Sequence, residues 1–346
     1  MCEELRPPKI TKPLLTIAIP TYGRAKYLKE LLSVLADQLK DEPHVELIIS
    51  DNASPDETRL VVQDFVDGGL RVRYICNAEN VGSDANFLQC FEQARGKYFW
   101  LFSDDDLIVP GALARILAYC QAAEYDLIWV SSYSFEGFFQ PRALKARKDA
   151  IEIADARTYA KQLHVFFTYI SGNIINKDKV VGSQSTAFSS LIGTGLVQLG
   201  WTYTALNGFT RGLYIREKLI AARANNTGGY KLFQVFGSTL AMITNAWLMP
   251  RSLGRIVING TLQRFWPLWL LAYKKRGRDF TDVARPQTAL TPVFGDNFRY
   301  WVFAYPVMVL PSVFAAVWVL AARVLNRLDK ALGFPMLDSR DESDGS

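Results

Sequence analysis

Between Leu14 and Ser131, short apolar runs alternate with segments whose apolar residues repeat at helical spacing. The apolar runs cover residues 14–19, 45–49, 72–76, 98–102 and 127–130. In the first helical segment, apolar side chains recur at i, i+3, i+4, i+7 and i+11, on one face: Leu28, Leu31, Leu32, Leu35 and Leu39. Strands alternating with helices predict an α/β fold, a mostly parallel sheet with helices on both faces.

The second helical segment begins with a start signal. Ser54 stands where an N-cap belongs, Pro55 takes the first helical position, and Glu57 is placed to complete a capping box. We therefore expect this helix to begin directly after Ser54. Ligands of parallel sheets bind outside the carboxyl ends of the strands, so the residues after each apolar run form the candidate site.

Polar, turn-forming residues follow four of the predicted strands, at 20–24, 50–54, 80–86 and 103–106. Several of these clusters precede a helix N-terminus, where free backbone N–H groups favour anions. Single members also have ordinary explanations. Asp51 can initiate a turn, and Arg24 can be a solvated residue at the start of a helix.

The acidic triplet Asp104, Asp105 and Asp106 follows an apolar run that reads as a buried strand. Adjacent carboxylates repel one another unless a cation or hydrogen-bond donors offset them. In a solvated surface loop, water would screen that repulsion. At the rigid edge of a sheet, the same oxygens suit Mg²⁺ or Mn²⁺ bound together with substrate phosphates. The position after a buried strand favours the metal site.

The four clusters together resemble the family-2 glycosyltransferases of the GT-A fold. The resemblance rests on Ile-Pro-Thr-Tyr-Gly-Arg at 19–24, Ile-Ser-Asp-Asn-Ala-Ser at 49–54, Asn-Val-Gly at 80–82 and Phe-Ser-Asp-Asp-Asp at 102–106. Ser-Asp-Asn-Ala-Ser with the later Asn-Val-Gly also resembles the abequosyltransferase-like branch of surface-polysaccharide enzymes. The resemblance implies a GT-A (Rossmann-like) sheet and inverting sugar transfer from a nucleotide-sugar donor to a glycan, or lipid-linked glycan, acceptor.

The resemblance also implies roles for individual residues. Asp51 would accept a hydrogen bond from the base, and Asp84 would lie near the base or the phosphates. The residues carried over to nucleotide-sugar binding are Pro20, Thr21, Tyr22, Arg24, Asp51, Asn52, Asp84 and Asp104. Aligning the family's metal motif on Pro110 makes Asp105 the ligand of Mn²⁺ or Mg²⁺, with Asp104 toward the ribose and Ser103 in place of an expected aspartate. A register one residue later would pair Asp104 with Asp106.

The general base should come from the region after residue 160, where no Glu-Asp pair stands. Gln198 cannot act as a base, Asp178 reads better as a helix cap, and His164 reads better as a core histidine among apolar neighbours. Asp106 remains a candidate by position. Arg223 precedes a polar, glycine-containing loop, and it reads either as a diphosphate clamp or as part of a surface hairpin.

The composition changes after residue 240, where five of the eight tryptophans and several basic clusters occur. Residues 300–322 contain no charged residue, which is long enough for a spanning helix to be considered. Pro306 and Pro311 would interrupt such a helix, and the basic residues beyond it fit a single span poorly. We therefore expect a re-entrant or interfacial arrangement at an anionic membrane surface, with a buried helical pair as the alternative.

These patterns predict a catalytic domain at 1–235, with a nucleotide-sugar half at 14–130 and an acceptor half at 131–235. A helical, membrane-associated segment at 236–337 and a disordered tail at 338–346 would follow. The net charge of +5 gives no indication of nucleic-acid binding. The four cysteines lack CxxC spacing, which indicates buried thiols in a reducing compartment. The N-terminal residues lack a signal-peptide core, so we expect the protein at the cytoplasmic face of the inner or plasma membrane.

Two other functions compete with this interpretation. A nucleotidyltransferase shares a nucleotide-binding sheet and an acidic metal site, but it would carry a glycine-rich, lysine-containing phosphate loop after the first strand. Residues 20–24 are not such a loop. A non-catalytic membrane-bound scaffold that kept a nucleotide-sugar fold is the second alternative, and Ser103 together with the missing base supports it.

Overall fold

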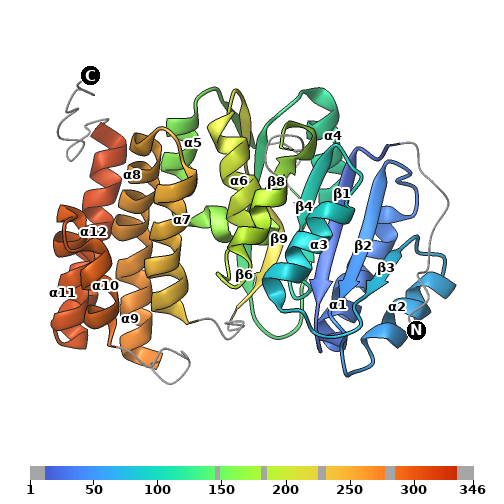
Figure 1. The fold of residues 1–346 in the computed structure, drawn as a ribbon, viewed down its shortest axis with the longest axis horizontal. Helices are drawn as coiled ribbons and strands as arrows, with labels where there is room; N and C mark the ends of the chain where they lie inside the picture. Colours follow the sequence, from blue (N-terminus) through green and yellow to red (C-terminus); the bar gives the residue numbers. More distant parts are fainter. Residues whose placement is uncertain (1–11, 145–148, 181–184, 225–230, 277–284, 333–346) are drawn as a thin grey trace.

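The computed structural model describes residues 12–144, 149–180, 185–224, 231–276 and 285–332. The molecule is elongated: a sheet-containing half carries the N-terminus, and a bundle of helices forms the opposite end (Figure 1). Buried apolar side chains of the two halves belong to one continuous cluster, in which Tyr159 and Leu163 join Ile256 and Val257. The predicted domain boundary at residue 235 stays a prediction.

Within the described residues the sheet has nine strands, eight of them in the order β3-β2-β1-β4-β8-β6-β9-β5, and β7 also pairs with β9. The strands are β1 (Leu15–Thr21), β2 (Val45–Asp51), β3 (Arg73–Cys76), β4 (Tyr98–Leu101), β5 (Leu107–Ile108), β6 (Leu127–Phe135), β7 (Ala150–Ile153), β8 (Asn173–Asn176) and β9 (Gly212–Arg223). β1 is parallel to both β2 and β4, and β2 is parallel to β3. β8 lies antiparallel between β4 and β6. The predicted α/β fold is confirmed.

Helices cover both faces of the sheet (Figure 1). On one face, α1 buries all five leucines of its predicted stripe, and residues of α2 and α4 join the same core. On the other face, α3 and α6 contribute Phe91 and Trp201 to the second core. The bounds of the helices are α1 (Ala25–Leu39), α2 (Thr58–Asp67), α3 (Ser83–Gln93), α4 (Ala112–Ala122), α5 (Ala156–Leu163) and α6 (Gln198–Asn207), with the 3₁₀ turns η1 (His164–Thr168), η2 (Ile170–Gly172), η3 (Lys177–Lys179) and η4 (Ser185–Leu191).

The predicted start of the second helix is wrong. α2 begins at Thr58, and the residue before it, Glu57, makes no capping bond with its side chain. Ser54 Oγ instead accepts the backbone N–H of Gly23 at 2.9 Å. Asp56 accepts the backbone N–H groups of Thr58 and Ala25 at 3.2 and 2.9 Å. A carboxylate accepts hydrogen bonds more strongly than a hydroxyl, so Asp56 takes the capping role and ties α2 to the start of α1.

The described residues of the C-terminal half form helices, which three π-helical turns interrupt. The bounds are η5 (Gln234–Thr239), α7 (Leu240–Trp247), α8 (Arg251–Gly260), η6 (Thr261–Phe265), α9 (Trp266–Arg276), α10 (Pro286–Phe294), η8 (Tyr300–Ala304), α11 (Tyr305–Val309) and α12 (Ser312–Leu332). The charge-free stretch is not one helix, because α11 ends before Pro311 and α12 begins after it. Within the described part of the chain, no helix is long and apolar enough to cross a membrane.

The cysteines in the described residues form no disulfide. Cys90 and Cys120 are buried, Cys76 is partly buried, and burial raises the pKa of Cys90 and of Cys120 to about 12. Their predicted role as small apolar core residues is confirmed for these two. Cys2 and the predicted tail at 338–346 lie outside the described residues.

His164 gives the fold a pH dependence. Burial, and then the positive charge of Arg264, lower the pKa of His164 to about 3. The unfolded chain binds a proton near pH 6.5 where the folded chain does not, so stability falls as the pH drops below 6.5. As the pH drops below 6.5, the free energy of unfolding should fall more steeply in wild type than in His164→Asn. The two slopes should differ by up to about 1.4 kcal/mol per pH unit. Urea unfolding at pH 7, 6 and 5 measures both slopes.

Asparagine is the matched replacement because its polar side chain does not titrate, and because asparagine tolerates a positive φ, here 39°, better than most residues. His44→Asn, at an exposed position, is the control for losing a histidine as such. Equal slopes for wild type and His164→Asn would contradict the prediction.

Candidate active site

The carboxyl ends of β1, β2 and β4 open on one edge of the sheet, and their polar clusters meet there. Thr21 pairs in register with Asp51. Thr21 Oγ1 donates to Asp104 Oδ2 at 2.8 Å, and Arg24 Nη1 donates to Asp104 Oδ1 at 3.0 Å. The same guanidinium nitrogen lies 3.6 Å from Asp105 Oδ2. Clusters from two distant parts of the sequence therefore form one site.

The acidic triplet is buried. Asp104, Asp105 and Asp106 are 3%, 7% and 4% exposed, so the reading of a solvated surface loop is wrong. Burial raises the pKa of Asp104 to about 6, although Arg24 and Thr21 favour its charged form. Burial, and then the negative charge of Asp105, raise the pKa of Asp106 to about 6. A bound cation would reduce the repulsion between these three buried carboxylates.

Tyr169 and Ser171, which the sequence did not indicate, support the position of Asp106. The Tyr169 hydroxyl donates to Asp106 Oδ2 at 2.8 Å, and Asp106 Oδ1 accepts the backbone N–H of Arg223 at 3.0 Å. Ser171 Oγ accepts the backbone N–H of Ser103 at 3.0 Å and also favours the charged form of Asp106. Tyr169 precedes the short 3₁₀ turn η2 and Ser171 lies within it, and this turn has no periodicity or motif that could have identified them.

Asp51 is buried at the end of β2, and both of its carboxylate oxygens have partners in the protein. Oδ1 accepts the backbone N–H of Ser54 at 2.9 Å, so the turn-initiating reading is confirmed. Oδ2 accepts the hydroxyl of Tyr74 at 2.5 Å, and burial, followed by this bond, raises the pKa of Tyr74. A carboxylate oxygen accepts more than one hydrogen bond, so Asp51 keeps capacity for a base N–H.

Asn52 uses its amide to shape the loop after β3. Its Oδ1 accepts Asn77 Nδ2 and the backbone N–H of Val81, both at 3.0 Å. Its Nδ2 donates to Asn80 Oδ1 at 2.8 Å and to Gly82 O at 3.2 Å. These bonds account for both donors and both lone pairs of the amide, so Asn52 positions the loop.

Asp84 fastens the segment before α6 to the nucleotide half. It is buried in the first turn of α3. Its Oδ2 accepts the backbone N–H of Gly195 at 2.7 Å, and its Oδ1 accepts that of Val197 at 3.3 Å. The carboxylate is therefore directed toward the backbone at residues 195–197.

Arg223 is not part of a surface hairpin, because its side chain is only 11% exposed. Its guanidinium donates to the backbone oxygens of Asp105 and Gly137, both at 3.3 Å, and forms an ion pair with Glu30. The rings of Tyr27 and Phe135 also contact it. Arg223 thus holds the backbone of the acidic triplet, and its action as a diphosphate clamp stays a prediction.

The first strand contributes residues of two kinds. Pro20 is buried within β1, where it pairs in register with Ser50. Tyr22 follows the strand, and its ring is 47% exposed beside the site. Pro20 is therefore part of the buried sheet beneath the site, whereas the aromatic side chain of Tyr22 is accessible to a ligand.

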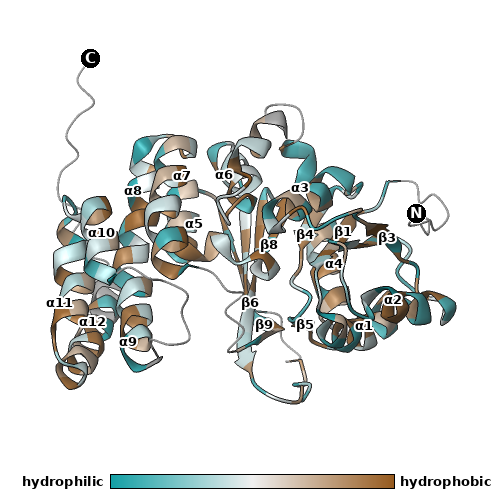
Figure 2. Ribbon diagram, turned by 60° about the horizontal axis from the view of Figure 1, so that its bottom comes forward, coloured by the Kyte–Doolittle hydropathy of each residue, from teal (hydrophilic) through white to brown (hydrophobic). Residues whose placement is uncertain are grey.

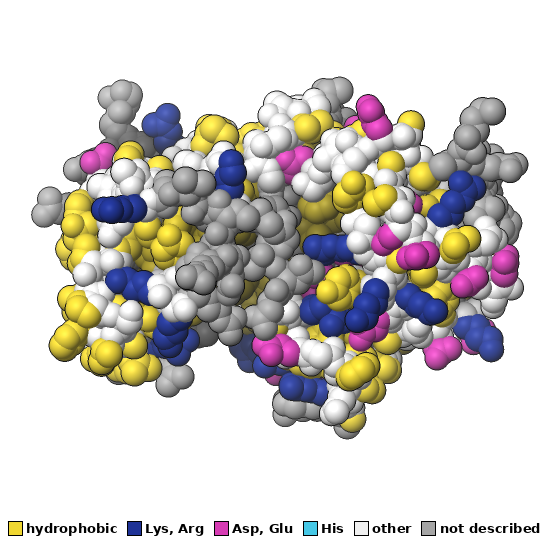
Figure 3. Space-filling model, turned by 90° about the horizontal axis from the view of Figure 1, so that it is seen from below, with side chains coloured by type: hydrophobic (Ala, Val, Ile, Leu, Met, Phe, Trp, Pro, Cys, Tyr) yellow, Lys and Arg dark blue, Asp and Glu magenta, His cyan; other side chains and the backbone are white. Residues whose placement is uncertain are grey.

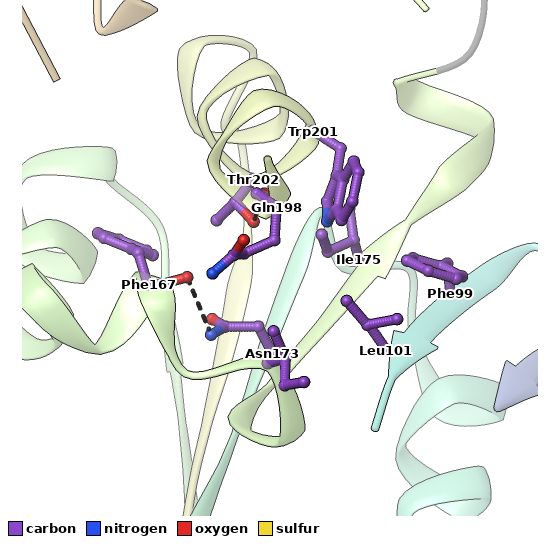
Figure 4. A pocket seen from close by; sticks show the side chains of 9 residues that line it. Phe99, Leu101, Phe167, Asn173, Ile175, Gln198, Trp201 and Thr202 are labelled. Carbon is purple, nitrogen blue, oxygen red and sulfur yellow. Dashed lines mark hydrogen bonds between the residues drawn. The ribbon is translucent and has the colours of Figure 1, made fainter. Parts of the chain in front are cut away.

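The other candidates for a base lie apart from the triplet. Asp178 pairs with Lys12 at 2.6 Å on the surface and lies within η3, whose N-cap is Asn176, so its predicted role as a helix cap is wrong. His164 is a buried core residue, as predicted, but its Nδ1 has no hydrogen-bond partner. Gln198 lines a small cavity together with Asn173, Thr202 and several apolar residues (Figure 4). The cavity has a volume of about 10 Å³, enough for roughly one water molecule, and Gln198 Oε1 has no protein partner there. It is too small to be a substrate site.

Among the described residues, no group of three or more His, Cys, Asp or Glu side chains is arranged to hold a metal ion by itself. Mg²⁺ is usually bound through one or two carboxylates together with substrate phosphates, so a site of this kind needs fewer protein ligands. The hard carboxylate oxygens of Asp105 and its two neighbours fit such a cation.

Residues 16–182 match the family model of glycosyl transferase family 2. The fold and the acidic site at the sheet edge agree with this match, and the chain therefore contains a family-2 glycosyltransferase domain.

Known proteins resemble both the sequence and the fold. Abequosyltransferase RfbV of Salmonella typhimurium is 37% identical over 107 residues, 31% of this chain and 32% of its own length. GalNAc(5)-diNAcBac-PP-undecaprenol beta-1,3-glucosyltransferase of Campylobacter jejuni is 30% identical over 106 residues, 30% of this chain and 34% of its own length. The chain thus matches about a third of the length of these relatives. The mannosyltransferase PcManGT from Pyrobaculum calidifontis, solved with GDP-Man and Mn²⁺, shares the fold. Its TM-score is 0.52 at 16% identity, over 92% of this chain and 88% of that one.

Proposed function

We propose that this chain is a metal-dependent, inverting glycosyltransferase that moves a sugar from a nucleotide-sugar donor to a glycan acceptor in surface-polysaccharide synthesis. One observation carries the proposal: a buried acidic triplet, bound by Thr21 and Arg24, at the edge where ligands of parallel sheets bind. The solved relative with GDP-Man and Mn²⁺ supports this class of donor and metal.

In this proposal, Asp105 would hold Mn²⁺ or Mg²⁺, which would supply positive charge for the leaving nucleoside diphosphate. Thr21 and Arg24 fix both oxygens of Asp104, which orients that carboxylate toward the ribose. Asp51 accepts a hydrogen bond from the base, and the exposed ring of Tyr22 packs against the base. Asn52, Asp84 and Arg223 act as positioning residues.

We propose Asp106 as the general base. Its pKa of about 6 leaves it deprotonated at neutral pH, yet closer to the pKa of an efficient base than an exposed aspartate. The Tyr169 hydroxyl and the backbone N–H of Arg223 orient the carboxylate. As the acceptor hydroxyl attacks the anomeric carbon, its proton would pass to Asp106, and the bond to the diphosphate would break on the opposite face.

The acceptor in this proposal is linked to a lipid, and the protein works at the cytoplasmic face of the inner or plasma membrane. The name of the Campylobacter relative includes an undecaprenol-linked substrate, which supports an acceptor of that class. The basic, apolar character of the C-terminal helices supports the location.

Donor binding tests the proposal directly. A panel of UDP-, GDP-, CDP- and dTDP-sugars, each with Mn²⁺, should contain one nucleotide class that raises the melting temperature, because a ligand of the folded state stabilises it by mass action. EDTA should remove the shift, and the same donor should release its nucleoside diphosphate when acceptor is added. A shift without any turnover would favour the non-catalytic scaffold. Absence of both would reject the proposal.

A further inference from the structure

The outer face of α12 is apolar where a surface helix is normally polar. Val313, Val317, Leu320 and Val324 recur at i, i+4, i+7 and i+11, a single stripe along the helix. The buried side chains of α12, which include Ala315, Val319 and Ala322, lie on the opposite side. The exposed apolar side chains of α12 are between 39% and 73% exposed: Val313, Phe314, Val317, Trp318, Leu320, Val324 and Leu325.

The apolar surface continues beyond α12. Trp301, in η8, and Val309, at the end of α11, which packs against α12, are 43% and 49% exposed. Figure 2 shows hydrophobic residues on α11 and α12 at this end of the molecule, and Figure 3 shows them as a surface with basic side chains between them. Soluble proteins rarely leave an apolar surface this continuous without a partner.

The charge of this part of the chain indicates which partner fits. Residues 231–332 carry thirteen Lys and Arg against four Asp and Glu, whereas residues 1–230 carry 25 against 26. The excess positive charge therefore belongs to the helical half. Arg323 is exposed beside the apolar stripe, and Lys274 Nζ donates to Leu310 O just before α12 begins. A second copy of the chain would place one positively charged surface against another. An anionic bilayer would instead complement the positive charge.

Two tryptophans at the face suit a membrane interface. The indole N–H of Trp301 donates to Gly295 O at 2.7 Å, and that of Trp318 donates to Val302 O at 2.9 Å. Both rings can thus enter an apolar layer without leaving a donor unsatisfied.

We propose that the outward face of α12, with Trp301 and Val309, docks onto an anionic lipid bilayer and lies in its interfacial layer without crossing it. This inference deepens the proposed membrane location by assigning it to one face. It also orients the molecule, because α12 lies at the end opposite the N-terminal strands (Figure 1). In this orientation the C-terminal helices contact the bilayer, and the sheet with the active site lies farther from it.

Vesicle sedimentation with the full chain tests the proposal. Wild type should sediment with phosphatidylcholine vesicles containing phosphatidylglycerol, and less with phosphatidylcholine alone or at high salt. The double variant Val317→Glu, Leu320→Glu should weaken binding by at least about tenfold, because it places two negative charges on the face that enters the bilayer. Leu60→Glu, on α2 and 65% exposed, is the matched control and should bind as wild type does.

Equal binding of wild type and the double variant would overturn the proposal, as would failure of wild type to bind. Sedimentation velocity without vesicles adds a further check: a dimer that the double variant dissociates would assign the face to a second copy instead. If the double variant loses its native melting temperature, the single variant Val324→Glu replaces it. No nucleotide sugar is present in these measurements, so loss of donor turnover and loss of vesicle binding are observed separately.

Discussion

Asp105→Asn should lower the release of nucleoside diphosphate by about a thousandfold in the presence of Mn²⁺. The substitution keeps the shape of the side chain and removes the charge that would hold the cation. Without that cation, the negative charge that develops on the leaving diphosphate loses its main stabilisation. A thousandfold loss corresponds to about 4 kcal/mol of transition-state stabilisation. The measurement is the initial rate of diphosphate release with the donor that the binding panel identifies.

The same variant should fold at least as stably as wild type in the absence of metal. The charge of Asp105 raises the pKa of Asp106, so removing it relieves repulsion between neighbouring buried carboxylates. A melting temperature equal to or above that of wild type would show that the activity loss is not a loss of fold. Asp64→Asn, at an exposed position on α2, is the matched control. Turnover within tenfold of wild type would instead favour Asp104 and Asp106 as the metal pair.

The donor side of the site could be predicted because it follows from local sequence. Asp104 follows the buried strand β4, which ends at Leu101, and Thr21 ends the parallel strand β1, so the sheet brings the two residues together. Tyr169 and Ser171 could not be predicted this way. They lie more than sixty residues after the acidic triplet, and tertiary packing alone brings them there.

Sequence patterns also do not distinguish a residue that binds a ligand from one that supports the site. Asn52 belongs to the same motif as Asp51, yet its amide is used in the loop after β3. Asp84 belongs to another cluster, yet it binds the segment before α6. The four-residue β8 was missed for a related reason, because Asn173–Asn176 is too short to show periodicity and its place between β4 and β6 depends on distant partners.

Trp201→Ala should lower the free energy of unfolding by about 4 kcal/mol. Trp201 is fully buried and joins α6 to the nucleotide half. Its ring stacks on Phe91 with 4.8 Å between centroids, and it makes edge contacts with Phe99 and Phe188. Because it already borders the small cavity at Gln198, truncation would enlarge that space, and the surrounding rings could refill it only in part (Figure 4).

Urea unfolding measures the loss directly, and the melting temperature should fall by roughly 10 °C. Trp201→Phe keeps an aromatic ring against Phe91 and should cost less than half as much as alanine, since a smaller cavity remains. Phe138→Ala, where the side chain is 96% exposed, is the control for losing an aromatic residue and should be nearly neutral. A loss below about 1 kcal/mol for Trp201→Ala would contradict the stacked arrangement, because an aromatic side chain buried among three rings cannot be removed so cheaply from a close-packed core.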